Sequence, residues 1–405
     1  MTHMIKIIKK TNRFSTAGFK ILKKDKKTKA RLGVLTTPHG KILTPSYVFV
    51  GTYGKFRHLA SKDIKRTKTQ VVIANTFHLW EKALKNKNRK GFIHKSFGLK
   101  MPVMTDSGGF QVLSLAFDDK NRVGKILSTL PTSQVGYPQR KTQNVKIAQK
   151  GVHFNFKGKK SFLGPELSMK LQSNIGADII FAFDQITSPL DDYKYNKKAV
   201  KLTDKWAEIC LKTRNHKQML FGIVQGGLFK DLRIKSAKSI GSMPFDGFGI
   251  GGSYTKKQIS KMLKWVVPHL PEEKPRHLLG VGKVVDIFEA VQNGVDTFDC
   301  VIPTREARHG RLYTKTGHMD IRKGVYFNDK KVIEKSCGCL TCSKKISRSK
   351  IRGLIKSDNT KLNADGQRWC LMHNMWFFNN LLEEIRKSIQ KEKFGEFKKK
   401  FLKNY

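Results

Sequence analysis

Eight short apolar runs, each closed by a glycine-rich or polar turn, constrain the fold of this chain more than any other feature. They occupy residues 47–52, 70–76, 102–109, 177–184, 220–227, 245–252, 276–282 and 295–301. Such runs are typical of parallel strands buried on both faces, and helical patterns fill most of the intervals between them. Eight strand–helix units favour an α/β fold, a (β/α)₈ TIM barrel, over the alternative of an open doubly wound sheet.

Two of the intervals carry clear helical patterns. Residues 255–270 place four apolar side chains on one stripe, namely Ile259, Met262, Leu263 and Val266. Residues 284–294 predict a helix that ends at Gly294 as its C-cap. The long polar stretch at about 116–151 breaks the rhythm and predicts an insertion between the third and fourth strands.

In a barrel, the carboxyl ends of all strands open on one face, where active sites lie. The polar and glycine residues gathered there are Asn75, Asp106, Ser107, Asp184, Gln225, Gly251, Gly252, Gly280 and Asp299. One aspartate in such a position is often only a helix N-cap. Three aspartates together with a glutamine and paired glycines favour a common pocket.

Three of the six cysteines lie in the short segment "SCGCLTC", at Cys337, Cys339 and Cys342. Thiolates at this spacing suit a tetrahedral zinc ion, and the alternative is three unrelated buried cysteines. A fourth ligand is expected from His373 on a helix farther along the chain, with Cys370 as the competing candidate. A closed set of four protein ligands leaves no open position, so we expect one structural Zn²⁺ per chain.

These observations divide the chain into four parts. We expect a basic N-terminal segment at 1–30, the catalytic barrel at 31–320, an inserted C-terminal zinc-binding subdomain with a closing helix at 321–385, and a basic C-terminal tail at 386–405.

The formal net charge of +49 favours polyanionic partners, above all nucleic acid. A lysine-rich genome bias would give the same composition. The basic ends at 20–31 and 391–405 are expected to be solvated and mobile. No apolar run is long enough to span a membrane and no signal peptide is evident, which predicts a cytoplasmic protein without membrane contact.

Seven segments resemble one known family in order and spacing. They are "MTDSGGFQVLSL", "FAFD", "GIVQGG", "GIGG", "LLGVGK", "FDCVIPTREARHGR" and "CGCLTC" with the distal histidine. From about Phe19 to about Ile389 the chain resembles tRNA-guanine transglycosylase (queuine tRNA-ribosyltransferase) of the bacterial type. The resemblance implies a barrel with a zinc subdomain. It also implies a pentosyltransferase of queuosine tRNA modification, which exchanges guanine at the anticodon wobble position for a 7-deazaguanine base, either queuine or its 7-aminomethyl precursor.

The resemblance also assigns roles to residues. Base exchange with retention needs a double displacement through a covalent enzyme–RNA intermediate. Asp299 is implied as its nucleophile and Asp106 as the general acid/base. The residues implied to bind the base are Asp106, Ser107, Gly108, Gly109, Phe110, Asp184, Gln225 and Gly252.

Two further segments are implied to bind RNA. They comprise Gly280, Val281, Gly282, Lys283, Val284, Val285 and Asp286, and then Thr304, Arg305, Glu306, Ala307 and Arg308. The arginines Arg305, Arg308 and Arg311 suit phosphate binding, although a solvated face would show the same pattern. The family implies a homodimer formed through the zinc region.

Several residues near the expected base pocket depart from the bacterial pattern. They are Gln185, Ile186, Ser253, Tyr254, Thr255, Lys256, Lys257 and Leu279. The loss of a glutamate expected after "GIGG" removes a partner for the ammonium of the 7-aminomethyl base, so we hypothesise salvage of queuine. Two other functions compete with the active enzyme, namely a catalytically silent tRNA-binding partner subunit and an archaeal-type enzyme acting elsewhere in tRNA. The presence of both Asp106 and Asp299 argues against the first, and the zinc spacing against the second.

Overall fold

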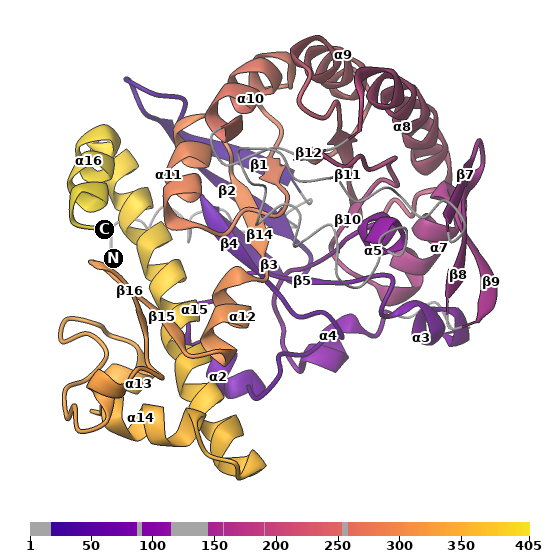
Figure 1. The fold of residues 1–405 in the computed structure, drawn as a ribbon. Coiled ribbons are helices and arrows are strands. Elements are labelled where there is room, and N and C mark those ends of the chain that lie inside the picture. Colours follow the sequence, from indigo (N-terminus) through magenta and orange to yellow (C-terminus); the bar gives the residue numbers. More distant parts are fainter. Residues whose placement is uncertain (1–17, 87–90, 115–144, 157, 190, 253–257) are drawn as a thin grey trace.

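The computed structural model describes residues 18–86, 91–114, 145–156, 158–189, 191–252 and 258–405, and eight parallel strands close into a barrel at its centre (Figure 1). In chain order these strands are β4 (Ser46–Val50), β5 (Val72–Ala74), β6 (Val103–Thr105), β10 (Ile179–Phe181), β11 (Met219–Val224), β12 (Gly247–Ile250), β13 (Arg276–Leu278) and β14 (Thr297–Cys300). The ring closes because β4 pairs with β14 and β6 pairs with β10. The predicted barrel is therefore confirmed, and each of the eight apolar runs overlaps one strand.

The barrel strands are short and apolar because both of their faces are covered. Every residue of β5, β6 and β10 to β13 is buried. The helices that follow the strands form the outer layer (Figure 1). They are α2 (Ser61–Arg66), α3 (Trp80–Lys85), α4 (Ile93–Phe97), α5 (Gly109–Ser114), α7 (Pro165–Ile175), α8 (Tyr193–Thr213), α9 (Lys230–Gly241), α10 (Ile259–Val266) with the 3₁₀ turn Val267–His269, α11 (Val284–Gln292) and α12 (Ile302–Arg308).

The two helical patterns read from the sequence are present. All four residues of the predicted stripe on α10 are buried. Helix α11 ends at Gln292 and its C-cap is Asn293, so Gly294, the predicted cap, lies one residue beyond the observed cap. Gly294 has φ +86°, a left-handed conformation that glycine adopts without a steric penalty where a helix ends.

Among the described residues, three small antiparallel sheets lie outside the barrel. They are formed by β1 (Gly18–Lys24), β2 (Arg31–Thr37) and β3 (Gly40–Thr44), by β7 (Val145–Ala148), β8 (Gly151–Phe156) and β9 (Lys159–Leu163), and by the hairpin of β15 (Arg311–Thr314) and β16 (Gly317–Asp320). Of the insertion predicted at 116–151, residues 116–144 lie outside the described residues. Its final part forms β7 and the first residue of β8.

The expectation of mobile basic ends is wrong for the residues that the structure describes. Residues 18–24 form β1, which pairs with β2 along its length. Near the other end, α16 (Phe394–Asn404) packs Phe394 and Phe401 against Phe288 of α11, with ring centroids 6.3 and 5.4 Å apart. Helix α16 is rich in lysine, but it also carries an apolar stripe that includes Phe394 and Phe401. Burial of this stripe holds the helix against α11.

The C-terminal part comprises the 3₁₀ turn Gly324–Tyr326 and helices α13 (Leu340–Ser343), α14 (Arg348–Ile355) and α15 (Thr360–Gln390), followed by α16. Helix α15 runs beside the barrel next to α12 and β15 (Figure 1). Arg368 on α15 forms an ion pair of 2.6 Å with the buried Asp63 of α2. Helix α15 extends to Gln390 and so passes the predicted domain boundary between residues 385 and 386. The domain limits stay a prediction. Within the described ranges no helix is both long and apolar enough to cross a membrane.

Candidate active site and zinc centre

Asp106, directly after β6, is held by three donors from its own and the neighbouring strand end. The backbone N–H of Thr76 and of Gly108 donate to Oδ1, at 2.9 and 3.2 Å, and Asn75 Nδ2 donates to Oδ2 at 2.5 Å. Gly108 has φ +83°, which lets its N–H turn back to the carboxylate. The carboxylate therefore has a fixed orientation, and Asn75 from the predicted strand-end group serves to hold it.

The environment of Asp106 suits a group that both gives and takes a proton. Burial and, to a lesser extent, the nearby charge of Asp299 raise the pKa of this carboxyl, whereas hydrogen bonds from Thr76, Gly108 and Asn75 lower it, and the net result is a pKa of about 7. A general acid/base works best when its pKa lies near the operating pH. Asp106 populates both of its protonation states close to neutral pH.

Asp299 lies on β14, and two donors bind the same oxygen of its carboxylate. His277 Nε2 lies 3.1 Å from Oδ1, and the backbone N–H of Gly280 donates to Oδ1 at 3.3 Å. Strand register explains this contact, because His277 on β13 pairs with Thr297 on β14 and Asp299 follows two residues later on the same face. The side chain of Asp299 remains 16% exposed, so a substrate can reach it.

A second carboxylate, Asp184, forms a polar pair with Gln225 on the neighbouring strand end. Gln225 Nε2 donates to Asp184 Oδ2 at 2.5 Å, and both side chains are buried. Burial raises the pKa of Asp184 to about 6, although hydrogen bonds from Gln225 and Ser107 lower it. A buried carboxylate next to an amide offers acceptors and donors in fixed positions, as recognition of a planar heterocycle requires.

The glycines around this pair allow close backbone approach. Gly252 has φ +86°, and a Cβ there would lie 2.6 Å from Gln225 Oε1. A Cβ at Gly109 would touch the ring of Phe183 at 3.4 Å. Phe110, at the start of α5, leaves 38% of its surface exposed, enough for stacking on a ligand. The structure thus places the predicted base-binding residues on the carboxyl-terminal ends of neighbouring strands.

Two polar residues of the site were missed by the sequence analysis, namely His277 and Arg233. Arg233 of α9 is fully buried and donates to the carbonyl oxygens of Gly227 and Gly251, at 2.8 and 2.6 Å. It thereby joins the two glycine-rich loops that flank Gln225. The available signal was a basic residue on the otherwise apolar stripe of a helix, and a histidine within an apolar strand.

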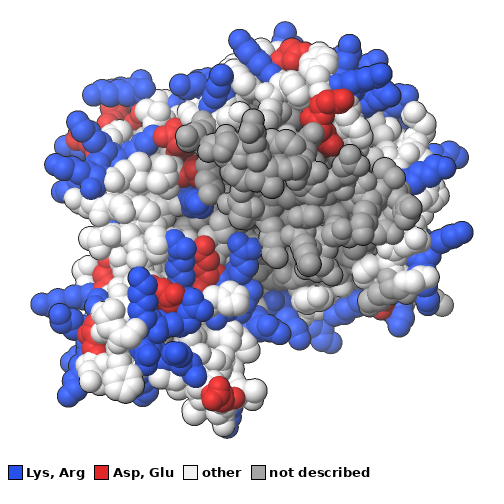
Figure 2. All heavy atoms as spheres, viewed as in Figure 1, with Lys and Arg blue, Asp and Glu red and all other residues white. Residues whose placement is uncertain are grey.

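The twelve residues expected to bind RNA divide by exposure. Gly280, Lys283, Val285 and Arg305 are exposed, and Glu306 and Arg308 are half-buried. The other six are buried, namely Val281, Gly282, Val284, Asp286, Thr304 and Ala307. Lysine and arginine side chains gather over the region of α12 and the β15–β16 hairpin (Figure 2). Two of the four exposed residues, Lys283 and Arg305, are basic, and none of the six buried residues is.

Among the residues that depart from the bacterial pattern, Gln185 is buried and its Nε2 donates to the hydroxyl of Tyr195 at 3.2 Å. Ile186 is half-buried. Leu279 is partly buried and packs against the apolar cluster formed mainly by residues of the barrel strands. Residues 253–257 lie outside the described residues.

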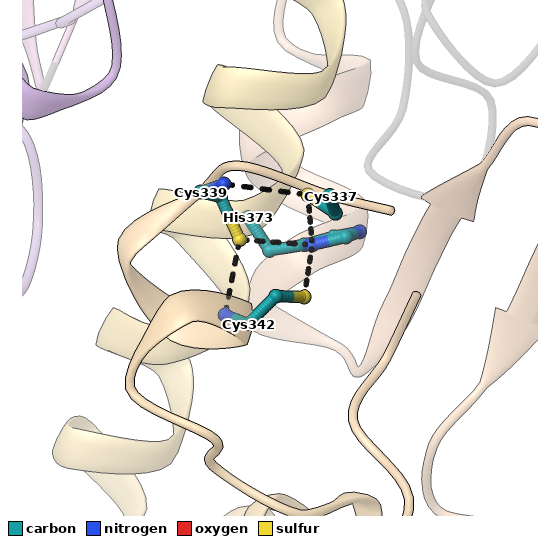
Figure 3. Close-up of side chains that lie close together, drawn as sticks. All are labelled: Cys337, Cys339, Cys342 and His373. Carbon is teal, nitrogen blue, oxygen red and sulfur yellow. Dashed lines mark hydrogen bonds between the residues drawn. The ribbon is translucent and has the colours of Figure 1, made fainter. Parts of the chain in front are cut away.

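The three clustered cysteines and His373 of α15 converge on one point (Figure 3). His373 Nδ1 lies 3.8, 3.4 and 3.7 Å from the Sγ atoms of Cys337, Cys339 and Cys342. In a tetrahedral zinc site, Zn–S and Zn–N bonds of usual length separate the sulfur and nitrogen ligands by roughly 3.6 Å. The four residues therefore fit one structural Zn²⁺, and His373 is confirmed as the fourth ligand in preference to Cys370.

The surroundings of the zinc ligands fix their orientation. His373 Nε2 lies 2.7 Å from the carbonyl oxygen of Tyr313, which makes it the donor and leaves the Nδ1 lone pair for the metal. The backbone N–H groups of Cys339 and Cys342 donate to Cys337 Sγ and Cys339 Sγ at 3.5 and 3.3 Å. All four ligands are buried. The cluster joins β15, the cysteine loop and α15, and it has no position for a substrate.

The fold and the site together define a TIM-barrel enzyme with paired carboxylates at the barrel mouth and a closed zinc site outside it. The family model for queuine tRNA-ribosyltransferase matches residues 25–405. Two queuine tRNA-ribosyltransferases, from Clostridium botulinum and Clostridium perfringens, are each 39% identical to the chain over 96% of its length, covering 99% and 98% of their own lengths. The chain belongs to the queuine tRNA-ribosyltransferase family.

Proposed function

We propose that this chain is a tRNA-guanine transglycosylase that exchanges guanine at the anticodon wobble position for a 7-deazaguanine base. The observation that carries the proposal is the pair formed by Asp106 and Asp299. One carboxyl has its pKa raised to about 7 by burial, and the other is fixed by two donors on one oxygen while its side chain stays accessible. Family membership supplies the substrate class.

In the first displacement, a carboxylate oxygen of Asp299 attacks C1′ of the ribose, and the bond from C1′ to the guanine nitrogen breaks. Protonated Asp106 gives its proton to the departing guanine, which leaves as a neutral base. The product is an ester between Asp299 and the RNA ribose, and Asp106 is now ionised.

In the second displacement, ionised Asp106 accepts a proton from the ring nitrogen of the incoming base. That nitrogen attacks C1′ from the face that guanine left, and the ester to Asp299 breaks. Both groups return to their starting states, and two inversions give net retention. Neither step needs the zinc ion, which would hold the C-terminal helices together.

The base would lie between the Asp184–Gln225 pair and the exposed ring of Phe110. Asp184 accepts hydrogen bonds from the ring N–H and exocyclic amine of a guanine-like base, and Gln225 and the Gly252 N–H address its carbonyl edge. Lys283, Arg305 and Arg308 would bind phosphates of the anticodon loop. We further propose a homodimer formed through the zinc region, where Val325 and Phe327 are 73% and 66% exposed.

The proposal is tested with tRNA that carries labelled guanine at the wobble position. Addition of queuine or of the 7-aminomethyl base should release the label, and the faster of the two identifies the natural substrate. Asp299→Asn should abolish both the release and the denaturation-resistant enzyme–RNA adduct. If the wild-type chain binds this tRNA but releases label with neither base, the silent tRNA-binding subunit is the correct function.

A further inference from the structure

His277 is an unusual residue for the interior of a barrel strand. It is fully buried on β13, between the ring of Phe181 on β10, with centroids 5.2 Å apart, and two polar groups of β14. Its Nδ1 lies 2.9 Å from Thr297 Oγ1, and its Nε2 lies 3.1 Å from Asp299 Oδ1. On its other side, β12 presents Gly249, which carries no charge. Both ring nitrogens are therefore committed to partners on the nucleophile strand.

The groups at the two ends of the Thr297–His277–Asp299 contacts determine which nitrogen of His277 carries a proton. An ionised carboxylate only accepts hydrogen bonds, so Nε2 must carry a proton and donate it to Asp299. The hydroxyl of Thr297 can donate to Nδ1 or accept from it, so the arrangement holds for both the neutral and the charged ring. Nε2 is thus a permanent donor to Oδ1.

The two carboxylate oxygens of Asp299 differ in their hydrogen bonding. The Nε2–H of His277 and the N–H of Gly280 both bind Oδ1. Within the described part of the chain, both hydrogen bonds of the Asp299 carboxylate go to Oδ1, and Oδ2 accepts none. Oδ2 is therefore the oxygen that keeps its lone pairs for attack, and its direction is set by the bonds that anchor Oδ1.

We propose that His277 is a positioning residue that aims the nucleophilic oxygen of Asp299 at the ribose carbon. This inference rests on the proposed role of Asp299 as nucleophile and adds to it a specific donor and a specific attacking oxygen. Misplacement of a reacting atom by about 1 Å can cost 10²-fold in rate, which is the scale of effect that a lost anchor should produce.

Three substitutions of His277 separate positioning from packing. His277→Phe keeps a ring against Phe181 but has no donor. His277→Gln places an amide N–H near the position of Nε2, whereas His277→Asn places it near Nδ1, next to Thr297. The rate of covalent adduct formation is measured in a single turnover, together with the Kd for tRNA, the melting temperature and the zinc content.

We expect His277→Phe to slow adduct formation about 10²-fold while the Kd for tRNA changes less than about twofold. His277→Gln should recover most of the rate, and His277→Asn should stay close to the phenylalanine variant. Equal rates for the glutamine and asparagine variants, or an adduct rate near wild type in His277→Phe, would overturn the inference. The glutamine–asparagine comparison stands even if the phenylalanine variant does not fold. Failure of the proposed function is distinct, since the wild-type chain would then form no adduct, and a wrong nucleophile assignment would leave the adduct in Asp299→Asn.

Discussion

Single residues at the barrel mouth are under opposing demands from stability and chemistry, and Asp106 shows this most clearly. Burial raises the pKa of its carboxyl to about 7, so the folded protein binds this proton more tightly than the unfolded chain does. The stability that this proton contributes is complete below the unfolded pKa near 3.8 and is lost as the pH rises through about 7. At pH 8 the carboxylate of Asp106 is ionised in the folded state, although its burial disfavours the charge.

Asp106→Asn should therefore abolish exchange and yet gain stability relative to wild type as the pH rises. The neutral amide avoids the cost of the buried charge, an advantage of about 4 kcal/mol at pH 8 that largely disappears near pH 4. Urea unfolding of both proteins at pH 4, 6 and 8 measures this difference. A difference in unfolding free energy that stays constant across this range would show that the carboxyl titrates normally.

Residues whose position alone reveals a role could be predicted from the sequence, and those that act through tertiary contacts could not. Asp106 and Asp184 follow apolar runs and Asp299 lies near the end of one, so the barrel hypothesis brought them together. The contacts of His277 depend on the register between β13 and β14, which no local pattern contains. Arg233 reaches two loops that lie before and after it in the chain, and its pairing requires the finished fold.

At the scale of elements, the zinc cluster connects helix α15 to the cysteine loop and to β15. Helix α15 supplies His373 near its middle, and His373 contacts Tyr313 of β15. The sequence predicted the site and left His373 and Cys370 as candidates for the fourth ligand, and the fold places His373 beside the three cysteines. By contrast, lysines are as numerous as the large apolar residues of α16, so the local composition does not indicate that Phe394 and Phe401 are buried. A short helix of this kind is held by packing against α11 and not by its own propensity.

The two cysteines Cys339 and Cys370 provide a matched test of the metal site, because both are buried in the same part of the fold. Cys339→Ser should lose the zinc and increase amide hydrogen exchange in α13 and the middle of α15, while the barrel strands stay protected. Cys370→Ala should keep about one zinc per chain. Metal content and exchange are read by mass spectrometry. Loss of zinc from the Cys370 variant, or its retention in the Cys339 variant, would contradict the assigned ligand set.

For the whole molecule, the question is whether the net charge of +49 acts as a diffuse field or through particular contacts. A diffuse field attracts any polyanion, whereas a defined interface releases a fixed number of counterions from the bound phosphates. The exposed Arg305 lies on α12, directly after β14. The exposed Lys238 lies on α9, on the other side of the barrel (Figure 1). The two residues carry the same charge and differ in place.

Arg305→Ala should weaken tRNA binding and reduce the slope of log K against log salt concentration by about one, because one phosphate contact is lost. Lys238→Ala should leave both the Kd and the slope within error of wild type. The measurement is fluorescence anisotropy of a labelled anticodon stem–loop between about 50 and 200 mM salt, a range over which several phosphate contacts change affinity strongly. Equal effects of the two substitutions would mean that the excess charge acts as a diffuse field, and that tRNA is positioned at the barrel mouth by the base pocket alone.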